Sequence, residues 1–218
     1  MLKKIIKETI IIFFLLAMLV MALTVYLAPC SPDKFPTHWN SQGQINGWSS
    51  RTFTALFFPG LSIGLYLLML ALPFIDPLKK NYSPFEGPYY LVRLWLVLFF
   101  DLLFLITILA GWGVNVNPGP YLIAGISLFL IALGKGLAKI KKNYFFGIRT
   151  PWTLQSETVW TKTHQFGGKI FITSGILAFL TIFLPTPYTF PVFLTLILAG
   201  ALLPVAYSYC IYKKYANH

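Results

Sequence analysis

Residues 9–28 read TIIIFFLLAMLVMALTVYLA, a continuous apolar run without a single charged side chain. An α-helix rises about 1.5 Å per residue, so about 20 apolar residues cross a hydrocarbon core about 30 Å thick. Further runs of spanning length begin near Phe53, Leu91, Pro120, Lys169 and Pro191. The sequence therefore predicts an all-α, polytopic membrane protein with six transmembrane helices.

The composition agrees with this class. Of the 218 residues, 57% are hydrophobic and 11% are charged, whereas charged residues make up about 25% of a typical soluble domain. The first run is longer than the apolar core of a signal peptide, which has about 7–15 residues. Because Ala28-Pro29-Cys30 is also a poor cleavage site, we expect this run to remain as a signal anchor.

The basic residues indicate the orientation of the chain. Lys and Arg gather in the cytoplasmic loops of multi-pass proteins. A cytoplasmic N-terminus, beginning with Lys3, Lys4 and Lys7, places all of the 17 basic residues except Lys34 and Arg51 on or near that side. We therefore expect both termini to be cytoplasmic in a bacterial or archaeal cell membrane, and we attribute the net charge of +11 to the bilayer and not to nucleic acid.

We expect three parts along the chain. Residues 1–75 form an N-terminal module with two spans and an external loop, residues 76–138 form two central spans, and residues 139–218 form an internal loop followed by two spans. The polar side chains concentrate in the two loops. These loops are therefore the candidate sites.

The external loop contains PTHWNSQGQINGW at residues 36–48. Gly43 and Gly47 are typical of turns, and Trp39 and Trp48 suit the membrane interface. Two interpretations stay open: a folded cap over the helix ends, or a cap that binds a ligand or peptide through its aromatic side chains.

Three residues of this loop are of types that bind metals, namely Cys30, Asp33 and His38. Zinc sites use about three or four protein ligands in close geometry, and a second His or Cys is missing here. We therefore expect no metal and no cofactor. A membrane metalloenzyme using these residues is kept as a third functional alternative.

The internal loop, residues 139–168, combines basic, aromatic and hydroxyl side chains. Thr150 followed by Pro151 predicts a helix start, with threonine as N-cap and proline at the first helical position. Trp152, Trp160 and Thr163 then recur at helical spacing, which predicts a short amphipathic helix. Such a helix serves either as an interfacial anchor beside anionic lipid or as a docking surface for a cytoplasmic protein.

A catalytic pair in this loop is disfavoured. Ser156 and His164 lie about 12 Å apart along a continuous helix, which is too far for a nucleophile and its base. We therefore expect no enzymatic activity.

Asp101 lies in the third predicted span, near the bilayer midplane. An ionisable group at this depth is costly and usually faces the bundle interior or water. Its candidate partner is Lys135, because the third and fourth spans are antiparallel and the glycines flanking Lys135 permit close helix approach. Arg93 is a less favourable partner for Asp101, because it lies about 12 Å nearer the cytoplasm. A protonated Asp101 bonded to a neighbouring helix and a role in ion or proton movement both stay open.

Two sets of residues, one in each loop, together match a family pattern. The external set is Pro36-Thr37-His38-Trp39-Asn40, Gly43, Asn46-Gly47-Trp48 and Arg51. The internal set is Asn143, residues 147–154 (GIRTPWTL), Ser156-Glu157, Trp160 and Thr163-His164. In this order, with several spans between them, the two sets resemble the SdpI family of bacterial membrane immunity proteins. One departure is Gln165, where a basic residue is expected.

The resemblance implies protection of the host against a secreted antimicrobial peptide toxin and, in the best-known member, capture of a winged-helix repressor at the membrane. Carried over by position, toxin binding falls on His38, Trp39, Asn40, Gly43 and Trp48, and partner docking on Arg149, Trp152, Ser156, Glu157, Trp160 and His164. We expect a non-enzymatic immunity and signal-transducing protein. The alternative is a transporter or lipid-handling protein that uses Asp101 and Lys135.

Overall fold

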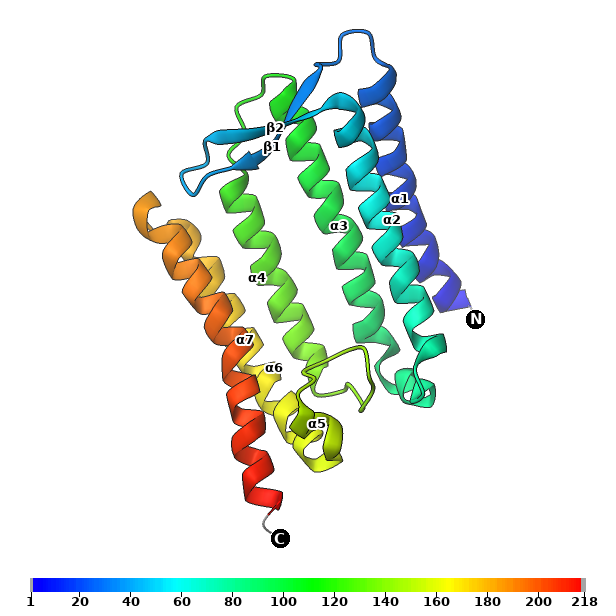
Figure 1. Cartoon of the computed structure of the whole chain (residues 1–218), viewed down its shortest axis with the longest axis vertical. Coiled ribbons are helices and arrows are strands. Elements are labelled where there is room, and N and C mark those ends of the chain that lie inside the picture. Colours follow the sequence, from blue (N-terminus) through cyan, green and yellow to red (C-terminus); the bar gives the residue numbers. More distant parts are fainter. Residues whose placement is uncertain (1, 217–218) are drawn as a thin grey trace. The chain divides into compact units, whose positions relative to one another are not determined.

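The computed structural model describes residues 2–216, with side chains for residues 5–215, so the side chains of Lys3 and Lys4 fall outside it. Figure 1 shows the elements in chain order. The helices are α1 (Leu2–Leu27), α2 (Arg51–Ile75), α3 (Glu86–Gly111), α4 (Pro118–Leu137), α5 (Pro151–Gln155), α6 (Glu157–Leu180) and α7 (Thr186–Ala216). Two short 3₁₀ turns, η1 (Lys79–Phe85) and η2 (Thr181–Phe183), and two strands, β1 (Lys34–Trp39) and β2 (Ile45–Ser50), complete the described chain.

Six of the described helical segments are long and apolar enough to cross a membrane. They are Ile5–Leu27, Arg51–Ile75, Lys79–Gly111, Pro118–Leu137, Glu157–Phe183 and Thr186–Tyr215. The prediction of an all-α, multi-pass membrane protein is therefore confirmed, with one small antiparallel hairpin added. The fifth span begins at Glu157 and not near Lys169, because the chain continues as one helix from the cap at Ser156.

The chain divides into two compact units. The first consists of Met1–Met69 and Arg93–Tyr121, and the second of Leu70–Val92 and Leu122–His218. The boundaries fall inside α2, α3 and α4. The predicted three parts follow the chain instead and stay a prediction.

The core of the first unit is formed by α1, α2, α3 and one hairpin residue. α1 contributes Met18, Ala22 and Val25, whose spacing of four and three residues places them on one helix face. Phe58 of α2 stacks on Phe104 of α3 with ring centroids 5.2 Å apart. The remaining core members are Phe35, Ala55 and Ile108. The helices of this unit run side by side, as Figure 1 shows.

In the second unit, α4 and α6 approach closely through glycines. A Cβ added at Gly134 would lie 2.7 Å from the Gly168 carbonyl oxygen, and one at Gly175 would lie 2.8 Å from the Ser127 carbonyl oxygen. Small residues permit this backbone contact between membrane helices. Of the two glycines flanking Lys135, Gly134 therefore faces α6, while Gly136 faces Pro88 of α3.

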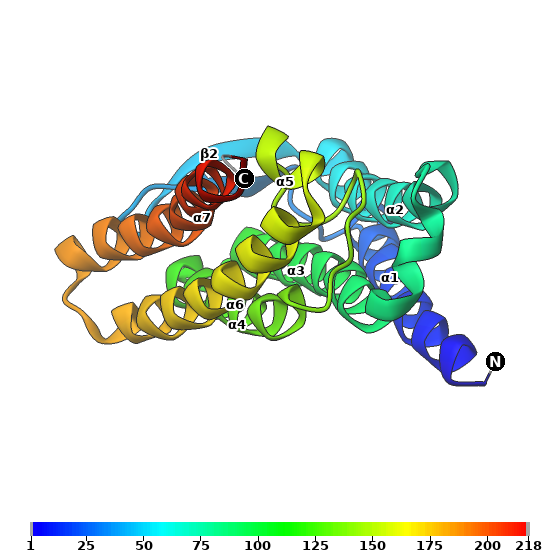
Figure 2. The same ribbon diagram turned by 90° about the horizontal axis from the view of Figure 1, so that it is seen from below.

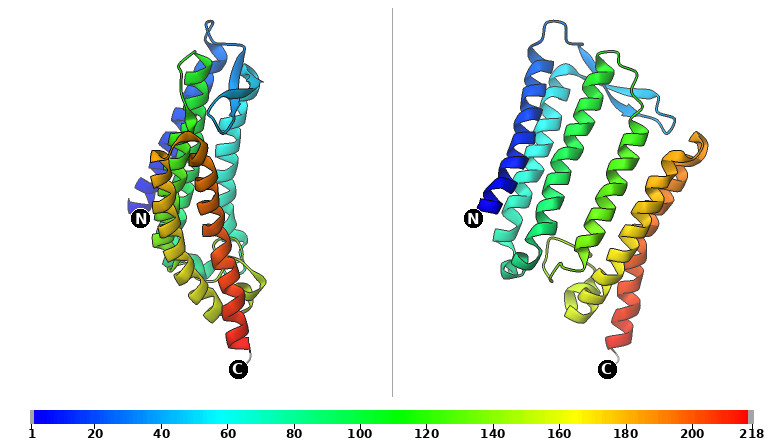
Figure 3. Two further views of the ribbon diagram at one scale, coloured as in Figure 1. Left: turned by 90° about the vertical axis from the view of Figure 1, so that its left-hand side faces the viewer. Right: turned by 180° about the vertical axis from the view of Figure 1, so that it is seen from behind.

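The remaining helices of the second unit pack together at the C-terminal end of the chain. α6 and α7 lie side by side and run in opposite directions, as the two views of Figure 3 show. The short α5 packs against both helices, as seen from below in Figure 2. This arrangement fixes the internal loop against the starting turns of α6.

Candidate functional site

The external PTHWN segment forms β1, which pairs antiparallel with β2. Between the strands, Asn40 Oδ1 accepts hydrogen bonds from the backbone N–H groups of Gln42 and Gln44 at 3.0 and 2.9 Å. Gly43 has φ +79°, a left-handed conformation in which glycine is favoured. The predicted compact cap is therefore a β-hairpin with a tight, asparagine-stabilised turn.

The hairpin is attached to the helices of its unit at two points. The Phe35 ring is fully buried and packs directly against Gly111 of α3, where any side chain would overlap it. Arg51, the first residue of α2, forms an ion pair of 2.6 Å with Asp33 just before β1. This pair is exposed, so the apolar contact supplies most of the attachment.

His38 holds the two strands together on the hairpin surface. Its Nδ1–H donates to Asn46 Oδ1 at 2.5 Å, and its Cβ lies where a side chain at position 47 would otherwise stand. Beside it, Asn40 Nδ2 donates to Gln44 Oε1 at 3.0 Å. Both side chains are committed within the hairpin, yet His38 remains exposed to solvent.

The two hairpin tryptophans differ in exposure. Trp48 is 55% exposed and Ile45 is 38% exposed, so two apolar side chains of β2 are accessible. Trp39 is half-buried, and its Nε1 is buried without a hydrogen-bond partner among the described residues. The hairpin thus brings the five predicted toxin-binding residues together, with Trp48 the most accessible aromatic side chain. No three His, Cys, Asp or Glu side chains gather as a metal site within the described part of the chain.

The internal loop is organised by buried polar groups. Asn143 is fully buried; its Nδ2 donates to the carbonyls of Lys141 and Phe146, and its Oδ1 accepts from the N–H groups of Phe145 and Phe146. Asp76, 2% exposed, accepts from the Tyr144 N–H at 3.0 Å. Since each bond replaces one lost to water, these two side chains fix the backbone of residues 141–146.

Two predicted docking residues, Trp160 and His164, prove to be internal supports. Trp160 is 2% exposed and donates from Nε1 to the Ile140 carbonyl at 2.7 Å. His164 is fully buried: its Nδ1–H donates to the Trp160 carbonyl at 2.8 Å, and its Nε2 accepts from the Ile148 N–H at 3.0 Å. The prediction of direct docking through these two side chains is corrected, because both are almost completely buried and their ring nitrogens are hydrogen-bonded inside the unit.

The helix start at Thr150 is confirmed, but the helix is shorter than predicted. Thr150 caps α5 and forms a capping box with Thr153, with proline at the first helical position. α5 ends at Gln155 because Ser156 adopts an extended conformation, and Ser156 then caps α6 by accepting from the Val159 N–H. Residues from Glu157 onward therefore belong to the fifth span and not to an amphipathic surface helix.

The other predicted docking residues remain accessible around α5. Arg149 and Glu157 are exposed, and Trp152 and Ser156 are half-buried. Arg149 Nη1 donates to the Tyr144 carbonyl at 2.5 Å, and the Trp152 ring lies 4.9 Å from that of Tyr209 on α7. A surface of mixed charge thus surrounds a short, rigidly capped helix.

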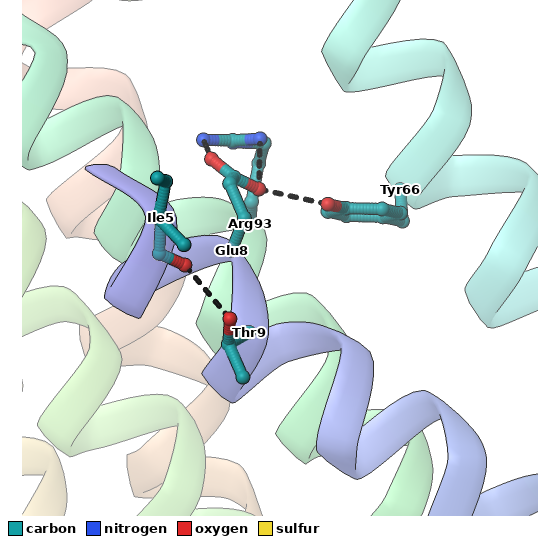
Figure 4. A network of polar contacts seen from close by, with 5 residues as sticks. All are labelled: Ile5, Glu8, Thr9, Tyr66 and Arg93. Carbon is teal, nitrogen blue, oxygen red and sulfur yellow. Dashed lines mark hydrogen bonds and ion pairs between the residues drawn. The ribbon is translucent and has the colours of Figure 1, made fainter. Parts of the chain in front are cut away.

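A polar network that sequence reasoning missed lies in the first unit. Figure 4 shows the Glu8 carboxylate between the Arg93 guanidinium and the Tyr66 hydroxyl. Arg93 donates from Nη2 and Nη1 at 2.7 and 3.1 Å, and Tyr66 donates at 2.8 Å. The Arg93 side chain is 7% exposed. One carboxylate therefore joins α1, α2 and α3. In the sequence, this network was signalled only by Glu8 and Arg93, each a charged residue at the edge of an apolar run.

No ion pair or side-chain hydrogen bond of Asp101 is found within the described part of the chain. Its Oδ1 is buried without a hydrogen-bond partner among the described residues. The hydroxyl of Ser62 on α2 is likewise buried without a hydrogen-bond partner among the described residues. Lys135 is exposed and belongs to the second unit, and the predicted ion pair stays a prediction.

Comparison with known proteins finds a family match over each of the two loops. Residues 139–208 match the SdpI/YfhL protein family, and residues 13–63 match a domain of unknown function, DUF1648. Over 183 residues the chain is 27% identical to the "Immunity protein SdpI" of Bacillus subtilis (strain 168), covering 84% of this chain and 86% of that protein. The resemblance to the SdpI family is confirmed. No solved structure matches the chain.

The two family matches follow the two units. The match at residues 13–63 lies within the first unit and spans most of α1, the hairpin and the start of α2. The SdpI/YfhL match lies within the second unit and spans the internal loop, α5, α6 and most of α7. The matched range therefore contains the buried residues Asn143, Trp160 and His164.

Proposed function

We propose that the protein is an SdpI-type membrane immunity protein that protects its host from a secreted antimicrobial peptide by binding and not by catalysis. The similarity to the Bacillus subtilis immunity protein over most of both chains supports this proposal. The six spans place such a protein in the bilayer that an amphipathic peptide would attack. The predicted orientation puts the hairpin on the outer face.

The observation that favours peptide binding is the exposure of two apolar side chains on β2. Trp48 and Ile45 are exposed on a hairpin whose shape is maintained by the turn at Asn40 and by the His38–Asn46 bond. A rigid aromatic anchor binds with little loss of conformational entropy, and fixed tryptophans commonly dominate binding energy. We therefore assign the primary peptide contact to Trp48, with His38 and Asn40 shaping the surface.

The test is a deletion strain challenged with its own culture supernatant. Loss of the gene should sensitise the cells, and expression of the wild-type protein should restore survival. Trp48→Ala should fail to restore survival, whereas Trp112→Ala should succeed, because Trp112 is similarly exposed but lies outside the hairpin at the end of α3. Both variants must reach wild-type levels in the membrane fraction. Survival of the deletion strain, or equal behaviour of the two variants, would overturn the proposal.

Signalling by repressor capture is a further part of this proposal. The exposed, oppositely charged Arg149 and Glu157 flank the capped α5, which favours a docking surface for a cytoplasmic protein. An adjacent gene for a small winged-helix repressor would supply the partner for a co-purification test. Arg149→Glu should abolish co-purification while Lys139→Glu, an exposed site on the same loop, should not. Retention of the repressor by Arg149→Glu would rule out this surface.

A transport function is the second candidate, and the half-buried Asp101, whose Oδ1 is buried without a partner among the described residues, favours it. An intramembrane carboxyl group without a protein partner is typical of ion and proton pathways. In vesicles containing the purified protein, Asp101→Asn should abolish flux, while leaving protection against the peptide intact. If Asp101→Asn instead abolishes protection and no flux is measured, the residue serves the immunity function or the fold.

A further inference from the structure

A cavity of about 250 Å³ lies within the second unit, where three elements meet. Asn81 and Pro84 of η1 form one side, Lys141 and Lys142 follow α4, and Trp160 comes from the first turns of α6. Glu157 and Thr161 complete the lining. The cavity therefore opens at the membrane face where α3 and α6 begin and α4 ends, the face that the distribution of basic residues marks as cytoplasmic.

The wall that holds the two lysines is fixed from both sides. Asn81 Nδ2 donates to the Lys142 carbonyl at 2.7 Å, and Asn143 Nδ2 donates to the Lys141 carbonyl at 2.9 Å. Trp160 Nε1 donates to the Ile140 carbonyl at 2.7 Å. These bonds connect η1, the loop and α6, so the cavity exists before any ligand enters and little ordering is needed on binding.

The charges at the cavity are unbalanced. Neither Lys141 nor Lys142 forms an ion pair or side-chain hydrogen bond with another described residue, and the Glu157 carboxylate is likewise unpaired. Two ammonium groups and one carboxylate leave one positive charge. A ligand with a single negative charge would balance it, and a second negative charge would be repelled by Glu157.

The polar and apolar surfaces of the cavity specify the ligand further. Lysine binds phosphate as a point charge, while Asn81 and Thr161 supply groups that hydrogen-bond to hydroxyls. Trp160 and Pro84 provide an apolar surface suited to carbon atoms next to the phosphate. We propose that this cavity binds a phosphodiester group with one negative charge and a hydroxyl-bearing substituent, as in the headgroup of phosphatidylglycerol or in a soluble glycerol phosphodiester.

The position of the cavity gives a lipid headgroup direct access. The cytoplasmic leaflet is rich in anionic lipid and attracts lysines near its surface. The cavity lies beside the ends of helices that are long and apolar enough to span a membrane, where lipid headgroups are expected. Binding here would hold the internal loop at the membrane surface, a role separate from the peptide contact at the hairpin.

The test is native mass spectrometry of the full-length protein in an uncharged detergent, with phosphatidylglycerol or phosphatidylcholine added. Wild-type protein should retain phosphatidylglycerol more strongly than phosphatidylcholine. Lys141→Gln and Lys142→Gln should each weaken retention by about fivefold, as expected for one lysine near an anionic headgroup. Glu157→Gln should strengthen retention because it removes the one repulsive charge.

The matched control is Lys139→Gln, which removes the same charge from an exposed site on the same loop but outside the cavity. It should leave retention unchanged, and all variants should unfold at the wild-type temperature. Equal effects of Lys139→Gln and Lys142→Gln would overturn the proposal in favour of unspecific charge attraction. So would retention that is unchanged in the Lys141→Gln/Lys142→Gln double variant.

The source of the phosphate is decided by competition with glycerophosphoglycerol, the same headgroup without acyl chains. If it displaces the lipid only at large excess, the ligand is the membrane lipid. If it displaces the lipid at equal concentration and depends on the same two lysines, the ligand is a soluble phosphodiester. Binding of neither compound rejects the site.

Discussion

The two loops that carry the family pattern each contain a histidine, and the two histidines have opposite environments. His38 in the hairpin is exposed and has one side-chain partner, Asn46. His164 in α6 is fully buried and bonds two backbone groups. The same contrast separates two arginine–carboxylate pairs of the first unit: Arg51–Asp33 at the hairpin is exposed, and Arg93–Glu8 is largely buried.

This contrast shows how the molecule divides its polar residues. At the hairpin, the polar contacts are short-range in sequence and exposed to solvent. They therefore shape a surface and contribute little to global stability. In the internal loop and the Glu8 network, polar contacts are buried and join segments far apart in the chain, so each lost partner leaves an unsatisfied group. Substitutions at the hairpin should therefore change binding, and substitutions at the buried groups should change folding.

The largest expected effect follows from removing the buried arginine. Arg93→Leu leaves the Glu8 carboxylate without its guanidinium and should lower the free energy of unfolding by about 3–5 kcal/mol. Arg51→Leu, which breaks the exposed pair, should cost at most about 1 kcal/mol. Denaturant unfolding of the purified protein in detergent measures both. The Glu8→Leu/Arg93→Leu double variant should recover most of the loss, because no charge is then left buried.

Equal losses for Arg93→Leu and Arg51→Leu would contradict the contrast between the two pairs. A double variant as unstable as Arg93→Leu alone would show that the two residues act separately.

The second effect concerns the two histidines. His164→Ala leaves the Ile148 N–H unsatisfied and opens a cavity at a fully buried site, so it should lower the free energy of unfolding by about 2–3 kcal/mol. His38→Ala should cost less than about 1 kcal/mol, as is usual for an exposed site. Denaturant unfolding in detergent measures both losses. Limited proteolysis at the internal loop should be faster in His164→Ala and unchanged in His38→Ala. Protection of the loop in His164→Ala would refute the supporting role.

Much of the fold follows from signals that are local in sequence. Continuous apolar runs specify the spans because the bilayer requires length and hydrophobicity alone, and Thr150-Pro151 specifies a helix start because capping involves the next three residues. The hairpin was less visible: its strands are short, and Pro36 and Gly47 weaken the alternation that marks a strand. The concentration of polar side chains and then the family resemblance, and not periodicity, indicated that this segment is a candidate site.

The buried polar contacts could not be predicted in this way. Glu8 lies 58 residues from Tyr66 and 85 from Arg93, and their meeting depends on how three helices pack. For His164, residue type and helical spacing fit a surface role and a supporting role equally well. What decided between them is Gly147, whose positive φ brings the Ile148 N–H to the imidazole. Sequence thus predicts where polar residues gather, while their burial requires the fold.

The smallest expected effect compares two glycines of the two loops. Gly43 in the hairpin turn and Gly147 in the internal loop both have positive φ, +79° and +115°. Alanine should cost about 1 kcal/mol in backbone strain at Gly43 and about 1–3 kcal/mol at Gly147, whose φ lies further from the left-handed region. At Gly43 the added Cβ meets only the exposed Asn117 side chain, which can move away. At Gly147 it would lie 2.5 Å from Nε2 of the buried His164.

Gly147→Ala should therefore cost at least about 1 kcal/mol more than Gly43→Ala, since the Ile148–His164 hydrogen bond is weakened as well. His164→Ala removes the overlap, so it should reduce the difference in unfolding free energy between Gly147→Ala and Gly43→Ala. A difference of unchanged size in that background would place the extra cost outside the histidine.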